Sequence, residues 1–228
     1  MLTETPYFHG VSIIAYNNGT ITMTSYLKKL PIILISLIIS GCSGLFITDE
    51  ELPRYTEPRY NTEEPIQLKV SQIKVISEFT PSFTRPHVEH LFPVSIEKTA
   101  KLWAQDRLKA ADFSTGKIAE VIIKDASVTE SLEESGNKLF NTDRVKYKAS
   151  LVMTVRITDP ENMSQASTNV DAWRELTIPA NTDIAEKEQY WSGMVSKLFD
   201  EFNVKMTSNI YEYLNMYVIN KPITPTYY

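Results

Sequence analysis

The clearest regularity in this chain is a strict alternation of apolar and polar residues over positions 145–157. The apolar positions are Val145, Tyr147, Ala149, Leu151, Met153, Val155 and Ile157. Successive side chains of a strand point to opposite faces, so this period predicts a strand with one buried and one solvated face, as in antiparallel sheets. Turn residues follow at positions 159–162, and positions 165–178 keep the same phase. We therefore predict a hairpin in which Arg174 lies on the apolar face, where that face meets an edge of the sheet.

Two other segments repeat their apolar residues at helical spacing. The first runs from an N-cap at Ser95 to about Ala111, with a stripe made of Ile96, Ala100, Trp103, Ala104, Leu108 and Ala111. The second follows Asp183, and its stripe consists of Ile184, Trp191, Val195, Leu198, Phe202, Met206, Ile210 and Leu214. A helix of about 30 residues would be roughly 45 Å long, so we expect a break near Asn203 or Asn209.

Two further apolar runs predict strands at positions 66–79 and 117–129. The first run slips by one position near Ser71-Gln72, which suggests a bulge. A polar connection is expected over 131–144. The predicted order is β-α-β-β-β-α, which indicates an α+β two-layer sandwich. We expect a four-stranded, mainly antiparallel sheet with both helices on one face.

The N-terminal region contains a short apolar run at positions 30–39, preceded by Lys28 and Lys29. The run is half the length that spans a bilayer, about 20 residues, and fits the apolar part of a signal peptide. It ends in Ile39-Ser40-Gly41-Cys42, which resembles the lipobox of bacterial lipoproteins. The resemblance implies cleavage between Gly41 and Cys42 and attachment of acyl chains such as palmitate to Cys42. The alternative is an uncleaved signal anchor in which Cys42 is an ordinary buried thiol.

These features divide the chain into five parts. Residues 1–22 lack any coherent signal and are interpreted as an upstream extension, with translation starting at Met23. Residues 23–41 form the signal peptide, 42–65 a lipidated N-terminus and disordered tether, 66–217 one globular domain, and 218–228 a flexible tail. The tether repeats Pro53-Arg54-Tyr55 as Pro58-Arg59-Tyr60. Its Arg-Tyr pairs are alternatively docking points for a partner.

Composition narrows the possible partners. The chain has a net charge of −5 and no run of Lys or Arg longer than two, whereas nucleic-acid binders usually carry a basic patch. Nucleic acid is therefore not expected as a partner. Cys42 is the only cysteine, so the fold must be stable without an internal disulfide.

No arrangement of residues reaches the specificity of a catalytic motif. His87 and His90 have a spacing that metal ligands can adopt on a helix, but Pro86 and Pro93 disfavour a helix there. The glycines are too scattered to form a phosphate-binding loop. The carboxylates of Glu130, Glu133 and Glu134 are most simply placed in a solvated loop, and Trp103 and Trp191 lie on their helix stripes. We expect no cofactor, no metal and no enzymatic activity.

Two surfaces are candidates for partner contact. One is Leu139-Phe140, apolar residues in the expected long connection. The other is an open edge of the sheet, which can accept a strand from another chain.

The motif, the tether and the element order resemble small periplasm-facing lipoproteins that assist envelope transport, including the lipopolysaccharide-assembly lipoprotein. The segments 88–93 and 103–108 also resemble uncharacterised alphaproteobacterial lipoproteins. The resemblance implies a membrane-anchored, non-enzymatic interaction or assembly factor with an envelope protein partner. Ser43 is not the aspartate of the inner-membrane retention signal, which favours the outer membrane over the inner. A lipid or small-molecule carrier is the alternative, and it would need a pocket lined by residues such as Trp103, Ile123 and Leu198. An enzyme would need His87 or His90 to meet acidic residues in a cleft.

Overall fold

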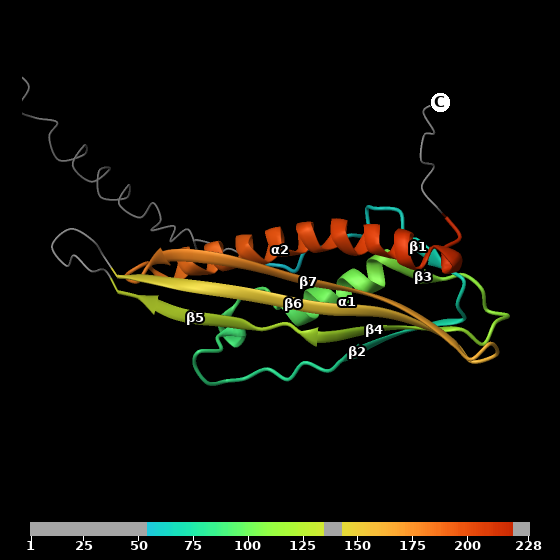
Figure 1. The fold of residues 1–228 in the computed structure, drawn as a ribbon. Helices are drawn as coiled ribbons and strands as arrows, with labels where there is room; N and C mark the ends of the chain where they lie inside the picture. Colours follow the sequence, from blue (N-terminus) through green and yellow to red (C-terminus); the bar gives the residue numbers. More distant parts are fainter. Residues whose placement is uncertain (1–53, 135–142, 221–228) are drawn as a thin grey trace, which may run out of the picture. The chain divides into compact units, whose positions relative to one another are not determined.

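A computed structural model describes residues 54–134 and 143–220 of the chain, which belong to one compact unit (Figure 1). The fold is α+β, as predicted, with both helices packed into the same apolar core as the sheet. Its elements are β1 Ile66–Leu68, β2 Gln72–Ser77, the short 3-10 helix η1 Glu89–Leu91, α1 Ile96–Arg107, β3 Leu108–Ala110, β4 Ile118–Asp125, β5 Val128–Glu133, β6 Arg144–Asp159, β7 Ser164–Pro179, α2 Ile184–Tyr213 and η2 Asn215–Tyr217. Among the helices of these residues, none is long and apolar enough to cross a membrane.

The hairpin of β6 and β7 contains the two longest strands of the main sheet. The two strands pair antiparallel along all sixteen residues of each. On its other side β6 pairs antiparallel with β4 and then with β5, which follow one another along it (Figure 1). The pairing of β4 with β6 contains a register shift between Ile123 and Asp125, at the end of β4. Strand β2 pairs parallel with β4 and completes a mixed, mainly antiparallel sheet.

The alternation over 145–157 has the predicted effect on burial. Odd-numbered residues of β6 from Tyr147 to Ile157 are buried under the helices, and their even-numbered neighbours mostly are not. We call the covered side of the sheet the helix face and the other side the open face. In β7 the even-numbered residues share the helix face, because each lies opposite an odd-numbered residue of β6.

Three predicted element boundaries were wrong. The run over 66–79 is two strands in two sheets, since β1 pairs parallel with β3 while β2 pairs with β4. The chain turns between them, where the Ser71 amide donates to the Lys117 carbonyl at 2.9 Å. The expected last turn of the first helix is strand β3, and the run over 117–129 continues as β5 to Glu133. Each difference depends on pairing with a distant segment, which local periodicity does not report.

The second helix has no break at either asparagine. Both side chains make tertiary bonds from within a continuous helix. Asn209 Nδ2 donates to the Asn169 carbonyl of β7 at 3.1 Å, and Asn203 Oδ1 accepts from Trp103 Nε1 at 2.9 Å. The start of α2 is capped by Asp183, whose Oδ2 accepts from the Ala185 amide at 3.2 Å.

Residues 54–65, which we call the strap, lack helix or strand but pack on the domain. Arg59 makes two bonds with Asp106 of α1, Nε to Oδ2 at 2.8 Å and Nη2 to Oδ1 at 2.6 Å. Tyr60 is buried; its amide donates to Asp106 Oδ2 at 3.0 Å and its hydroxyl reaches Asp200 of α2 at 3.3 Å. Bonding to Arg59, and then to the Tyr60 amide, lowers the pKa of Asp106. The second Arg-Tyr pair is therefore bound by its own domain.

A polar network continues the strap between the two helices. Glu63 accepts from Asn203 Nδ2 at 2.9 Å and pairs with the buried Arg107 at 3.1 Å. Arg107 Nη1 also donates to the Glu64 carbonyl at 2.6 Å. At the other end, the Ile219 amide donates to the Gln67 carbonyl at 2.9 Å. The packed domain thus extends beyond the expected 66–217 at both ends, because these polar residues find buried partners far away in sequence.

Candidate functional site

Strand β7 forms an edge of the main sheet, and within the described residues it pairs only with β6. The direction of its backbone groups follows from the ladder. Opposite residues of antiparallel strands alternate between pairs that exchange both hydrogen bonds and pairs that exchange none. Ala180 lies opposite Asp143 in this register, and its amide donates to the Asp143 carbonyl at 2.8 Å. Even-numbered residues of β7 are therefore bonded to β6, and odd-numbered residues point their N–H and C=O groups outward.

Two further observations agree with this phase. The carbonyl of Asn169, an odd-numbered residue, accepts the bond from Asn209 of α2. Pro179, also odd-numbered, has no N–H group, and at its position no N–H donates to β6. Beyond Asn169, the outward backbone groups of Asp171, Trp173 and Glu175 have no hydrogen-bond partner among the described residues.

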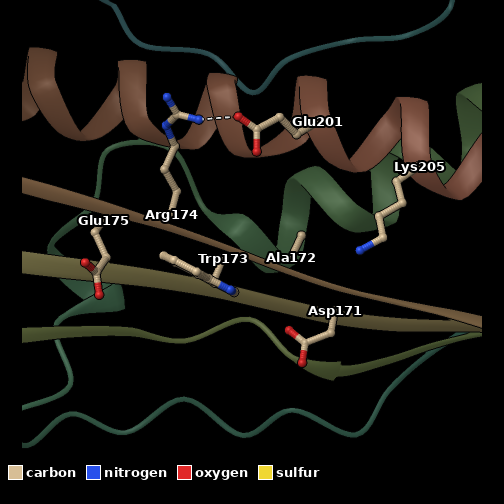
Figure 2. A pocket seen from close by; sticks show the side chains of 7 residues that line it. All are labelled: Asp171, Ala172, Trp173, Arg174, Glu175, Glu201 and Lys205. Carbon is tan, nitrogen blue, oxygen red and sulfur yellow. Dashed lines mark hydrogen bonds and ion pairs between the residues drawn. The ribbon is translucent and has the colours of Figure 1, made fainter.

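A groove follows this stretch of the edge (Figure 2). Its first part, about 420 Å³, is lined by Asp171, Ala172, Trp173, Arg174, Glu175, Glu201 and Lys205. A second part of about 210 Å³ shares Arg174 and Glu175 and is otherwise lined by Leu176, Gln189, Tyr190, Gly193, Met194 and Lys197. Side chains of β7 form one wall and those of α2 the other, so an extended segment could lie between them.

The helix side of the groove is charged. Arg174 points toward α2 and forms an ion pair with Glu201, as Figure 2 shows. Lys205 and Lys197 belong to the same wall, and no ion pair is found for either among the described residues. A charge on the helix face of an edge strand discourages unspecific pairing with apolar strands. The sequence placed Arg174 on this face and at an edge, but did not identify Glu201 as its partner.

The open side of the groove presents one aromatic ring between two carboxylates. Trp173 is 58% exposed, and Lys148 Nζ lies 5.5 Å from its ring centroid. Glu175 binds Lys146 at 2.8 Å, and this hydrogen bond raises the pKa of Lys146. No ion pair is found for Asp171 in the described part of the chain. Of the tryptophans, Trp173 alone lies at the surface, because Trp103 and Trp191 are core residues as predicted.

The structure does not bring His87 and His90 into a metal site with other described residues. His87 Nδ1 lies 3.9 Å from Glu89 Oε2, and His90 packs its ring 5.5 Å from that of Phe83. Within the described ranges, no three His, Cys, Asp or Glu side chains are arranged to hold a metal ion. Glu130 is paired with Arg85 at 3.0 Å.

Glu133 and Glu134 are exposed, and Glu133 ends strand β5 rather than lying in the expected loop.

The residues required by a carrier pocket are packed in the core instead. Trp103, Ile123 and Leu198 are each fully buried. The Trp103 ring packs edge-on against Phe202, with 5.1 Å between the ring centroids, and its N–H donates a hydrogen bond to Asn203. The groove along β7 is lined by other residues.

Four of the predicted site residues lie outside the described residues: Gly41, Cys42, Leu139 and Phe140. The interpretation of 1–22 and 23–41 concerns the same undescribed part of the chain.

Comparisons with known proteins give only distant likenesses. No family model matches the sequence, and no curated protein matches it. Among solved structures, a minor lipoprotein from Acinetobacter baumannii is 12% identical, with a TM-score of 0.36 over 68% of this chain and 99% of that one. The rare lipoprotein B from Shewanella oneidensis is 16% identical, with a TM-score of 0.29 over 60% of this chain and 94% of that one. Because identity and TM-scores are low, we take the function from this chain's own residues.

Proposed function

We propose that this protein is a lipid-anchored, periplasm-facing lipoprotein of the outer membrane that acts as a non-enzymatic interaction or assembly factor. In this proposal an envelope protein adds an extended strand to the free edge of β7. The observation that carries the proposal is the outward row of backbone groups at Asp171, Trp173 and Glu175, open along a groove. Main-chain bonds of this kind supply affinity in strand addition, while the flanking side chains supply selectivity.

The anchor is proposed from the motif at Ile39–Cys42. Two or more acyl chains hold a protein stably at a membrane, whereas one does so only marginally. The strap shortens the chain between Cys42 and the packed domain, since Arg59 and Tyr60 are bound to the helices. From Cys42 to Arg54 a fully extended chain spans at most about 40 Å, which sets an upper limit on the distance between the lipid and the start of the strap.

Labelling with palmitate tests the anchor. The full-length protein should incorporate the label, Cys42→Ala should not, and globomycin should block cleavage before Cys42. Absence of label on the wild type would refute the anchor and leave the strand-addition part of the proposal intact.

Photo-cross-linking in cells tests the edge. A benzoylphenylalanine in place of Trp173 should form a cross-link to an envelope protein. Adding Asp171→Pro, which removes an outward N–H, should abolish that product, whereas Asp171→Ala, which keeps the N–H, should retain it. A product unaffected by the proline would refute strand addition at this edge.

A further inference from the structure

From the charges along the groove we infer the kind of segment that the β7 edge accepts. This inference rests on the proposed strand addition. The segment that binds is extended, belongs to a different protein and carries charges of alternating sign. Its residues on the helix side are acidic, and its residues on the open side are basic around one apolar residue.

The backbone phase decides which side each partner residue takes. Trp173 and its two odd-numbered neighbours point their side chains to the open face, since they lie opposite even-numbered residues of β6. Directly opposite residues of paired strands share a face. Partner residues opposite Asp171, Trp173 and Glu175 therefore lie on the open side. Those opposite Ala172 and Arg174 lie on the helix side, against α2.

The helix side favours carboxylates on the partner. Arg174, Lys197 and Lys205 line it, while Glu201 is the single carboxylate among the residues from α2 and the helix face of β7. Glu201 is already bound to Arg174. Ala172 is small, so an acidic side chain opposite it has room to approach Lys205 (Figure 2).

The open side favours the opposite charge. Two carboxylates, Asp171 and Glu175, flank the exposed ring of Trp173. No ion pair is found for Asp171 among the described residues, whereas Glu175 shares its charge with Lys146, as Arg174 does with Glu201 on the helix side. Opposite charges on directly opposed residues stabilise a strand pair, and like charges destabilise it. Basic residues fit opposite the two carboxylates, and an aliphatic residue fits opposite the indole.

The same charges argue against a second copy of this chain as the occupant. Antiparallel self-pairing centred on Trp173 would place Asp171 opposite Glu175 twice. Centring the pairing on either carboxylate places that residue opposite itself. Centring the pairing on Ala172 or on Arg174 places Trp173 opposite a carboxylate. None of these arrangements is complementary.

Two peptides of identical composition test the inference. The matched peptide is acetyl-Thr-Lys-Glu-Val-Glu-Lys-Thr-amide, and the control, acetyl-Thr-Glu-Lys-Val-Lys-Glu-Thr-amide, exchanges the two charges. Both sequences read the same in either direction, so parallel and antiparallel pairing give the same faces. Each is titrated into the mature full-chain protein in detergent micelles, and amide shifts and hydrogen exchange are followed by NMR.

We expect the matched peptide to bind at least about tenfold more tightly, since four charge pairs each contribute about 0.2–1 kcal/mol. It should slow exchange at the amides of Asp171, Trp173 and Glu175 and leave those of Ala172 and Arg174 unchanged. Lys205→Glu should reduce the preference. Equal binding of both peptides with slowed exchange at the odd-numbered amides would overturn the charge pattern while strand addition stands. Binding of neither, or protection elsewhere, would overturn both.

Discussion

The direction of the β7 backbone groups can be tested by moving a proline by one residue. Asp171 and Ala172 are neighbours in the middle of the strand, and no ion pair is found for Asp171 among the described residues. The assigned phase points the Asp171 amide to solvent and the Ala172 amide to Leu151 of β6. A proline should therefore be tolerated at the first position and damaging at the second.

The expected magnitudes follow from what each proline removes. At Ala172 it deletes a ladder bond, leaves the carbonyl of the fully buried Leu151 without its donor, and drives the ring toward that carbonyl. Together these cost roughly 3–4 kcal/mol. At Asp171 the ring faces the groove and no ladder bond is lost, so the cost should stay within about 1 kcal/mol.

Thermal unfolding followed by circular dichroism gives the measurement. In a domain of this size, 1 kcal/mol shifts Tm by about 2–4 °C. Ala172→Pro should lower Tm by about 6–15 °C, and Asp171→Pro by no more than about 4 °C, with Asp171→Ala as the side-chain control. If Asp171→Pro destabilises the protein as much as Ala172→Pro, the phase assignment is wrong and the free row of backbone groups with it.

Three further predictions concern the strap and the core. Asp106→Ala removes the acceptor of Arg59 and of the Tyr60 amide. Because Arg59 is half exposed and regains water, we expect the free energy of unfolding to fall by only about 2–3 kcal/mol. Urea unfolding measures this change, and an unchanged midpoint would contradict the prediction. The pKa of Asp106 lies below its ordinary value because Arg59 and the Tyr60 amide bind the ionised form. Its contribution to stability is therefore complete above about pH 4 and lost as the pH falls through the lowered pKa. The free energy of unfolding should fall more steeply from about pH 4 to pH 2 in wild type than in Asp106→Asn, and parallel curves would argue against the pairing. Leu198→Ala should cost about 2–5 kcal/mol, since the side chain is fully buried between helix and sheet; a cost below about 1 kcal/mol would indicate an unfilled space there.

Most of the fold was predictable because its signals are local. The alternation over 145–157 and the apolar stripes of both helices each depend on residues within a few positions, and all three appear in the structure, except that Ile184 is exposed and that Leu108 and Ala111 lie beyond the end of α1. The α+β class follows from their order. The candidate site was only half predictable. An open edge was expected and Arg174 was placed at one, but nothing in the sequence tells which edge stays unpaired.

The sequence by itself determined the β6–β7 hairpin, the two helices, most of the faces that they bury and the lipobox-like motif, because period, capping and spacing are properties of neighbouring residues. Tertiary structure alone decided that Arg59 meets Asp106 and that Trp103 meets Asn203, partners 47 and 100 residues apart. It also decided that Arg174 faces Glu201 across a groove. The physical reason is that a buried polar group must find a partner wherever the fold places one. The row of backbone groups left open on β7 likewise depends on which strands pair, and pairing is a property of the whole sheet.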